Sequence, residues 1–460
     1  MTVPAPGEAI AERICSWAEG LQSDSLPIRV KAIAARQLID VVGLCLAARR
    51  SDYVAAVIEG CQDTGPCTLI GHSSTRSAPG AALINGTAAH GEDYDDTFEG
   101  TPVHAGAVIV PAVLAASEHY HRSGSDALKG VVTGVEFMCR MALVAPGAIH
   151  RAGFHPTAVI GALGAALGAG AALGLNAKAL ASAMGIAGSL AGGIIEYLAE
   201  GTWTKRLHAG WAAHSGVRAA LFARAGFVGP RTVLDGRHGF FHAFTNGDLE
   251  PDFGSLTNAL GHRWLMEGVA FKPYACGTMA QPFIDCALAL RKVGIDADSI
   301  ASIHCRVGEG TVHRLWEPLA DKRRPASSYS AKFSVPYCIA VGVLDGAAGL
   351  AQFTEARLSD PKVLDLAARI GYRIDPANEY PANYTGHLEV RLVDGARHEF
   401  HQAHLRGGKN EPLSDSELLA KYQANASLGG WDEAQTARAQ ALLSTLFADG
   451  DLARLAQLRT

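Results

Sequence analysis

Apolar residues in the first 268 positions recur every three or four residues, which is the period of one face of an α-helix. The clearest run, within a predicted helix at residues 28–48, is Ala32, Ala35, Leu38, Ile39, Val42 and Leu46. Further helices are predicted at residues 8–21, 104–121, 126–144, 157–173, 177–198 and 208–225. Glycine, proline or asparagine occurs at the breaks between them, as expected at helix ends. The pattern predicts no strand in this part of the chain.

After about residue 269, the pattern changes to the alternation of apolar and polar residues that half-buried strands show. Residues 302–307 and 387–392 alternate in this way. Asp394-Gly395 separates the second run from another short run at residues 398–405, so we expect a β-hairpin there. Helices are predicted between these strands, at residues 281–291, at residues 334–350, and after Asp360-Pro361, where Asp360 caps a short helix.

The helical pattern returns after residue 408, with one helix opening at Ser414 and another at residues 432–447. These patterns predict a mainly α fold. We expect a large all-helical domain at residues 1–268 and 408–460, and a smaller α+β domain at residues 269–407 inserted before the C-terminal helices. The length of 460 residues also favours two domains, because a single core stops growing at roughly 250 to 300 residues.

The amino-acid composition and the net charge limit the kinds of molecule that the protein is expected to bind. Hydrophobic residues make up 48% of the chain and charged residues 18%, so part of the apolar surface is expected in a subunit interface. A net charge of -5 with interleaved signs offers no basic stripe and argues against nucleic acid. The nine cysteines include no Cys-x-x-Cys pair, and the N-terminus lacks the apolar block of a secretory signal. We therefore expect a cytoplasmic protein with reduced cysteines.

Residues 158–175 carry no charge and approach the length of a membrane span. Most of them are alanine and glycine, which favour membrane insertion far less than leucine or phenylalanine. Small residues of this kind let helices approach one another closely. We therefore interpret the segment as the central helix of a bundle, and expect no membrane association.

Side chains able to carry protons or charge are densest between His90 and Gly106, inside apolar flanks. Burying such groups without partners costs several kcal/mol each, which suggests a functional site. Its candidate residues are Asp93, Asp95, Asp96, Thr97 and His104. Asp93 and Thr97, four residues apart, would share a face at a helix end. A carboxylate beside a histidine can orient the imidazole for acid–base chemistry, although any single aspartate here could equally cap a helix.

Three further stretches carry candidate residues. His155 precedes the Ala/Gly helix, where the helix dipole would lower the pKa of its imidazole and free amides would favour an anion. Lys205 and Arg206 lie between two apolar helices and could clamp a carboxylate. Lys272 precedes a proline at the proposed domain junction, where an extended backbone could direct its amine into a cleft. Taken alone, each could also be an ordinary cap, basic turn or solvated lysine.

In this order and together, five motifs resemble the MmgE/PrpD family, which includes 2-methylcitrate dehydratase, cis-aconitate decarboxylase and iminodisuccinate epimerase. They are Asn85-Gly-x-x-x-His90, Asp93-Tyr-Asp-Asp-Thr97, Gly153-Phe-His155, Thr204-Lys205-Arg206-Leu-His208 and Lys272-Pro-Tyr. The resemblance implies a homodimer with a cofactor-free site in the cleft that acts on small polycarboxylates. By their match to the family pattern, six residues are implied to line that site: Asp93, Thr97, His104, His155, Lys205 and Lys272.

The activities of this family share proton removal or delivery at a carbon next to a carboxylate, with cations stabilising the anionic intermediate. We expect His104 and His155 to carry protons and Asp93 to orient one of them, whereas Asp95 and Asp96 would hold the turn. The expected cations are Lys205, Arg206 and Lys272. The expected enzyme is a lyase, either a dehydratase or a decarboxylase, acting on a small di- or tricarboxylate. An isomerase or epimerase of a dicarboxylate would use the same proton abstraction.

Other classes of function remain as alternatives. Asp93 to Thr97 also matches the Asp-x-Asp-Asp-Thr signature of class II terpene cyclases, but those need an aromatic-lined cavity and aromatic residues are only 7% of this chain. A metal site with His90, Asp93, Asp96 and His104 has suitable residue types without any fixed ligand spacing. A non-enzymatic interaction protein would instead carry the charged groups apart on its surface.

Overall fold

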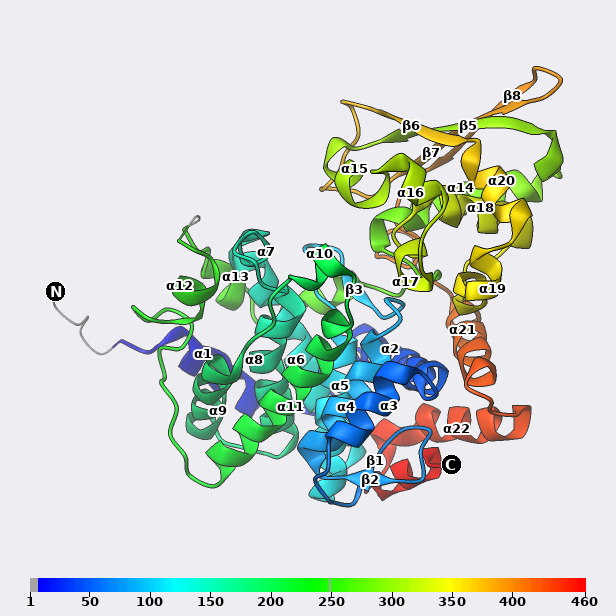
Figure 1. The fold of residues 1–460 in the computed structure, drawn as a ribbon. Helices are drawn as coiled ribbons and strands as arrows, with labels where there is room; N and C mark the ends of the chain where they lie inside the picture. The colour runs from blue at the N-terminus through cyan, green and yellow to red at the C-terminus, as the bar shows by residue number, and fades with distance from the viewer. Residues whose placement is uncertain (1–6, 248–249) are drawn as a thin grey trace. The chain divides into compact units, whose positions relative to one another are not determined.

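The computed structural model describes residues 7–247 and 250–460, and helices predominate among them (Figure 1). The mainly α fold predicted from the sequence is therefore confirmed. The described chain forms two compact units. Unit 1 comprises the described residues of Met1–Gly91, Asp95–Val269 and Leu419–Thr460, and unit 2 comprises Glu92–Tyr94 and Ala270–Leu418. The domain division expected from the sequence stays a prediction.

Unit 1 is a helical bundle. Its helices are α1 (Ile10–Gly20), α2 (Ile28–Ala48), α3 (Asp52–Gly60), α4 (Ala78–His90), α5 (Gly106–His119), α6 (Gly124–Val144), α7 (Ala148–Arg151), α8 (Pro156–Ala172), α9 (Ala177–Leu190), α10 (Tyr197–Glu200), α11 (Thr204–Arg224), α12 (Phe240–Phe244), α13 (Gly254–Thr257) and α22 (Glu433–Thr445). Helix α21 (Asp415–Leu428) begins in unit 2 and continues in unit 1. Short 3₁₀ turns are η1 (Ser23–Ser25), η2 (Leu265–Gly268), η6 (Leu446–Ala448) and η7 (Leu452–Leu458).

Three two-residue strands, β1 (Cys67–Thr68), β2 (Thr75–Arg76) and β3 (Thr97–Phe98), also lie in this part of the chain, and β4 (Val269–Ala270) ends it. The prediction of no strand in the first 268 residues is therefore wrong. The reason is length, because a two-residue strand is too short to show a period of two in the sequence.

Helix α8 lies at the centre of unit 1, and every residue from Thr157 to Ala172 is buried. It packs against α6, α9 and α11 (Figure 1). A Cβ atom added to Gly216 of α11 would lie 2.3 Å from Ala165 Cβ, so the small residues permit the close approach of these helices. In the described chain, none of the helices has the length and apolar character needed to cross a bilayer.

Helices α4 and α11 approach one another still more closely. A Cβ atom on Gly210 of α11 would lie 2.2 Å from the carbonyl oxygen of Leu83 in α4. On the other helix, a Cβ atom on Gly86 would lie 2.8 Å from Gly210 Cα. Glycine at both positions therefore lets the two backbones touch, and this contact fixes His90, the last residue of α4, relative to the first turns of α11.

The helices predicted at residues 8–21, 28–48, 104–121, 126–144 and 157–173 agree within about two residues with α1, α2, α5, α6 and α8, whereas α3 and α4 were not predicted. Two helices differ near the candidate site. Helix α9 ends at Leu190 rather than near residue 198, because Ala191 is extended and two glycines follow, with Gly193 at a φ of 134°. Helix α11 begins four residues earlier than predicted, so that Lys205 and Arg206 belong to its first turn.

Unit 2 contains a four-stranded sheet with the strand order β6-β5-β7-β8. The strands are β5 (Ile300–Val307), β6 (Ile370–Ile374), β7 (Gly386–Leu392) and β8 (Arg397–Gln402). Strand β5 is parallel to β6 and antiparallel to β7, and β7 is antiparallel to β8. The predicted hairpin at Asp394-Gly395 is confirmed, with Gly395 at a φ of 91°.

Helices of unit 2 cover one face of this sheet (Figure 1). Helix α14 packs against β7 and β8, and α18 packs against α14 and α20. The helices are α14 (Gln281–Lys292), α15 (Glu309–Leu315), α16 (Leu319–Arg323), α17 (Ser328–Ala331), α18 (Val335–Asp345), α19 (Glu355–Leu358) and α20 (Pro361–Ala368), with 3₁₀ turns η3 (Thr278–Ala280), η4 (Ala297–Ser299) and η5 (Leu350–Phe353). The predicted cap is confirmed, because the Asp360 carboxylate accepts a hydrogen bond from the Lys362 amide.

Candidate active site

The acidic stretch after α4 is a loop rather than a helix end, and β3 is the only strand that interrupts it before α5. Asp93 has a φ of 55°, in the left-handed region that aspartate tolerates better than most residues. Asp93 and Thr97 therefore do not share the helix face that their spacing suggested. Instead, neighbouring aspartates point in different directions and bind different partners.

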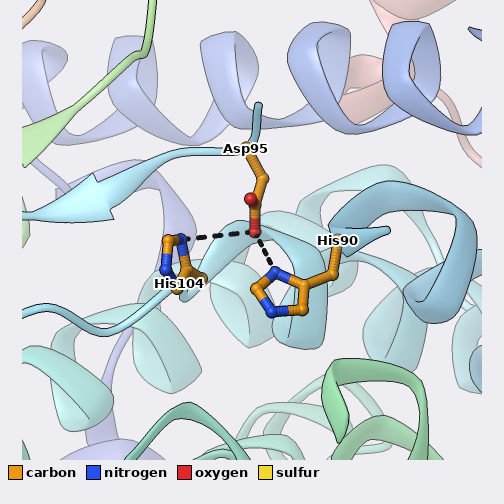
Figure 2. Close-up of side chains that lie close together, drawn as sticks. All are labelled: His90, Asp95 and His104. Carbon is orange, nitrogen blue, oxygen red and sulfur yellow. Dashed lines mark hydrogen bonds and ion pairs between the residues drawn. The ribbon is translucent and has the colours of Figure 1, made fainter. Parts of the chain in front are cut away.

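Asp95 lies between two histidines of unit 1 (Figure 2). Its Oδ2 atom is 2.7 Å from Nδ1 of His90 and 3.4 Å from Nδ1 of His104. The side chains of His90 and Asp95 are fully buried, and that of His104 is 9% exposed. At this depth little water screens the carboxylate, so its charge acts strongly on both imidazoles.

The hydrogen-bond partners define the tautomers of the two rings. His104 Nδ1 also lies 2.8 Å from the carbonyl oxygen of Asp96. A carbonyl oxygen only accepts, so His104 carries a proton on Nδ1, and Nε2 is the acceptor atom of the neutral ring. His90 Nδ1 likewise donates to the Asp95 carboxylate. Its Nε2 is buried and has no hydrogen-bond partner among residues 7–247 and 250–460.

A second pair of histidines lies beside the first. His155, the residue before α8, places Nδ1 at 3.2 Å from Nδ1 of His208 in α11, so one ring donates a proton and the other accepts it. The His155 ring stacks on His90 with 5.7 Å between ring centroids. Tyr197, at the start of α10, contacts both rings of the second pair edge-on.

Burial keeps the second pair neutral. It lowers the pKa of His155 well below the ordinary value, and the neighbouring His90, Lys205, His208 and His104 lower it further. The pKa of His208 falls to about 4, through burial and then the positive charges of His90 and Lys205. The direction predicted for His155 from the helix dipole is thus confirmed, but burial is the principal cause.

Asp96 has a structural role in the loop. Its carboxylate accepts hydrogen bonds from Gln37 Nε2 at 2.7 Å and from the Gly106 amide, the first residue of α5, at 3.0 Å. A Cβ atom on Gly106 would lie 2.5 Å from Asp96 Oδ1, so glycine is needed there. Burial, and then the nearby Asp95 charge, raise the pKa of Asp96 to about 7.

Asp93 and Lys272 form a buried ion pair within unit 2. Lys272 Nζ lies 2.8 Å from both the carboxylate and the carbonyl oxygen of Asp93, with side chains 1% and 4% exposed. Lys332, which was not a candidate from the sequence, holds Glu92 through its carbonyl oxygen at 2.7 Å and through its carboxylate. Two lysines therefore fix residues 92–94 in unit 2.

The remaining candidates lie in unit 1. The Arg206 guanidinium stacks over the Tyr53 ring at 4.4 Å and is half-buried, as is Lys205. Thr97 is buried in β3, and its Oγ1 has no hydrogen-bond partner within the described chain. Their assignment to a substrate site stays a prediction, as does that of Asp93 and Lys272.

The metal site considered from the sequence stays a prediction. The Asp93 carboxylate pairs with Lys272, and the Asp96 carboxylate binds Gln37. Atoms of His90, Asp95 and His104 do lie within 4.8 Å of one another. However, both Nδ1 atoms face oxygen acceptors at hydrogen-bond distance and carry protons, so this cluster is a hydrogen-bonded one.

Sequence reasoning did not assign proton transfer to three residues of this cluster: His208, which was noted only inside a motif, His90, which was considered otherwise only as a metal ligand, and Asp95, which was assigned to the turn. A signal existed for His208, because a helix starting at Thr204 would place it three residues after Lys205 on one face. No local signal singles out Asp95 among the aspartates of this stretch, since the loop conformation decides where each carboxylate points.

Unit 1 brings four buried histidines and the Asp95 carboxylate together, with the half-buried Lys205 nearby, and such clusters of titratable groups with shifted pKa values are typical of enzyme active sites. Residues 12–252 match the MmgE/PrpD N-terminal domain, and residues 274–445 match the MmgE/PrpD C-terminal domain. The chain belongs to the MmgE/PrpD family, which confirms the resemblance, and it is an enzyme of the lyase class.

Similar curated proteins include three cis-aconitate decarboxylases or proteins like them. Human cis-aconitate decarboxylase is 29% identical over 93% of this chain and 90% of its own length. The cis-aconitate decarboxylase-like protein oryM of Aspergillus oryzae is 28% identical over 93% of this chain and 92% of its own. Cis-aconitate decarboxylase of Aspergillus terreus is 27% identical over 91% of this chain and 89% of its own length.

Proposed function

We propose that the protein is a decarboxylase of a small unsaturated tricarboxylate of the cis-aconitate type and that it needs no cofactor. The observation that carries the proposal is the pair of histidines, His90 and His104, on one buried carboxylate, Asp95. Such a pair supplies a proton carrier in fixed orientation. The names of its relatives support the choice of decarboxylation over other lyase reactions.

In this reaction the bond between a CH₂ group and its carboxylate breaks, and carbon dioxide leaves. The electron pair of that bond forms a new double bond, while the former double bond moves its electrons to the next carbon. That carbon takes one proton, so the substrate trianion and one proton give a dicarboxylate dianion and carbon dioxide. The enzyme must therefore bind several carboxylates and deliver one proton.

The described residues suit both tasks. In our proposal His104 delivers the proton from Nε2, since its Nδ1 is held by the Asp96 carbonyl. Neutral His155 binds a carboxylate or an intermediate as a hydrogen-bond donor. Lys205 and Arg206, in the first turn of α11, supply positive charge. We also propose that Asp93, Thr97 and Lys272 take part in substrate binding, which substitution of each residue would test.

The test is incubation of the purified enzyme with cis-aconitate and a panel of other di- and tricarboxylates, with detection of carbon dioxide and products. We expect carbon dioxide release with cis-aconitate and, in heavy water, one deuterium in the product. H104Q and H155Q should lose at least about 100-fold in kcat, whereas H238Q, at an exposed histidine, should not. Absence of carbon dioxide from every substrate would overturn the proposal.

The same experiment separates the alternatives. A dehydratase would release water from a hydroxylated tricarboxylate and leave all its carboxylates in place. An isomerase or epimerase would exchange deuterium into a dicarboxylate without changing its formula. Each uses proton transfer next to a carboxylate, so the same histidines would be needed.

We also propose that the enzyme is a cytoplasmic homodimer. All nine cysteines are free, which suits a reducing compartment. Large apolar side chains are exposed at α10 and along α11, namely Leu198, Trp203, Trp211 and Phe222. A second copy of the chain would cover them. Light scattering should show that the wild type is a dimer and that W211E weakens this dimer. V393E, at an exposed valine of unit 2, should leave the dimer intact. A monomeric wild type would contradict the proposed homodimer.

A further inference from the structure

The four buried histidines form a continuous row of ring contacts. Ring centroids are 4.9 Å apart between His104 and His90, 5.7 Å between His90 and His155, and 5.3 Å between His155 and His208. Neighbouring imidazolium charges repel strongly in such a buried place, so the row cannot hold many protons at once.

The two halves of the row differ in charge environment. The His90 and His104 half contacts the Asp95 carboxylate. The His155 and His208 half is next to the Lys205 cation, and Tyr197 contacts it without any charge. Asp96, whose carbonyl oxygen contacts His104, also carries a carboxylate, but its charge is reduced near neutral pH because its pKa is about 7.

We propose that Asp95 is a positioning residue that keeps the transferable proton on the His90 and His104 pair, with His90 as its second carrier. The proposal rests on the proposed function only in taking His104 as the proton donor. Three observations support it: Asp95 Oδ2 is shared by the two Nδ1 atoms, both carboxylate and His90 side chain are fully buried, and His90 Nε2 is a buried nitrogen with no hydrogen-bond partner in the described chain.

The charge balance gives the physical reason. With one proton on the pair, the Asp95 charge and the imidazolium charge cancel, so the cluster is neutral and costs little to bury. A proton on the other half would leave Asp95 charged without its counterion and would place a second cation beside Lys205. The row of four rings therefore has two halves with different tasks. His90 and His104 hold the transferable proton, and His155 and His208 stay neutral and form hydrogen bonds.

The test compares D95N with D96N, the neighbouring buried carboxylate whose side chain bonds Gln37 and the α5 amide instead of an imidazole. Because asparagine cannot neutralise an imidazolium, D95N should move the alkaline limb of the kcat profile to lower pH by about one unit or more. D96N should change the free energy of unfolding, but its alkaline limb should lie within a few tenths of a pH unit of the wild-type limb. Equal limbs in D95N and wild type would overturn the proposal.

Nitrogen NMR of the histidine rings gives a readout that needs no substrate. At pH values below the alkaline limb of the kcat profile, we expect wild-type imidazolium signals from His90 or His104, assigned with H90Q and H104Q, and none from His155 or His208. D95N should remove them. If these signals behave as expected but cis-aconitate is not decarboxylated, only the proposed function fails. If imidazolium instead appears on His155 or His208, the proton placement fails, whatever the reaction.

Should D95N fold poorly, H90N provides a second variant, because asparagine can still donate a hydrogen bond to Asp95. It should reduce kcat by about 10-fold or more with KM changed less than threefold, since His90 supports the proton step rather than substrate binding. An unchanged kcat in H90N would remove His90 from the proposal.

Discussion

Asp96 is a carboxylate whose protonation is linked to folding. Its pKa lies near 7 in the folded enzyme, chiefly through burial, and near 3.9 in an unfolded chain. The folded state therefore binds the proton more tightly. The contribution of this residue to stability is present at acidic pH and is lost as pH rises from about 4 towards 7.

We predict that D96N removes this dependence. The free energy of unfolding of the wild type, minus that of D96N, should decrease between pH 5 and pH 6.5 by up to about 1.4 kcal/mol per pH unit. His155 and His208, with lowered pKa values, give the opposite slope, but they are present in both proteins and cancel in the difference. Urea unfolding at each pH measures this difference in free energy, and D235N, at an exposed aspartate, is the control.

Lys205 allows a second prediction at this scale. Because its positive charge lowers the pKa values of His155 and His208, K205Q should raise both, although burial will keep them below the ordinary histidine value. Ring-nitrogen NMR would show this shift. In our proposed function, kcat should fall by about 100-fold to 1,000-fold, as for loss of one stabilising charge. An unchanged His208 pKa would contradict the electrostatic account, and R218Q is a matched control further along α11.

At the residue level, sequence predicted which residue types assemble but not which partner each one takes. His104 and His155 were identified, and they do lie in one buried cluster. Asp95, which was expected only to hold the turn, contacts both His90 and His104, and the Asp96 contact with Gln37 joins residues 59 positions apart. Such long-range contacts leave no trace in a local pattern.

At the scale of elements, the contact between α4 and α11 sets the spacing of the histidines. We predict that G210A destabilises the fold by about 1–3 kcal/mol or more, because the added methyl would meet backbone atoms of α4 that cannot rotate away. Activity should fall with it, since the two helices carry His90 and His208. G60A, whose new methyl would meet nothing within 4 Å in α3, is the control and should be neutral or slightly stabilising. Full stability of G210A would show that the helices can separate freely.

A buried ion pair fixes α21 to α2. Lys421 Nζ lies 2.7 Å from Asp40 Oδ1, with side chains 4% and 1% exposed. Removing one partner leaves a buried charge, so K421M should lower the free energy of unfolding by about 3–5 kcal/mol, and D40N/K421M should recover part of this loss. R454M, in a more exposed pair with Asp449, should cost less than about 1 kcal/mol. Similar losses for both single variants in urea unfolding would contradict this argument.

Elements were predicted best where the periodic pattern is long. Helices α2, α6, α8 and α14, the strands β5 and β7, and the hairpin turn agree within about two residues. The start of α11 was missed because Lys205 and Arg206 make its first turn polar. The early strands were missed because two residues cannot define a period.

For the whole molecule, we predict that metal removal does not affect the enzyme. In our proposed function every step uses protons and side-chain charges, and the Nδ1 atoms of His90 and His104 already donate hydrogen bonds. Dialysis against a strong chelator, followed by metal analysis, should leave kcat unchanged. Loss of activity that zinc or another divalent ion restores would contradict the hydrogen-bonded interpretation of the cluster.

The fold class followed from sequence because helical periodicity extends over most of the chain. The family also followed, because five separated motifs occur in one order. Unit 2 includes residues 92–94, which the sequence did not indicate, since two lysines from positions 272 and 332 bind this short segment. Only the folded chain brings such distant partners together.

The shared proton between His155 and His208 has a consequence for the direction of catalysis. Both rings stay neutral only if one Nε2 takes up a proton and the other Nε2 releases one while the shared proton crosses between the Nδ1 atoms, and this relay changes His155 Nε2 between hydrogen-bond acceptor and donor. The ring need not rotate for this change. In our proposed function such a relay would meet the requirement of microscopic reversibility, because the group that gives a proton in one direction accepts it in the other.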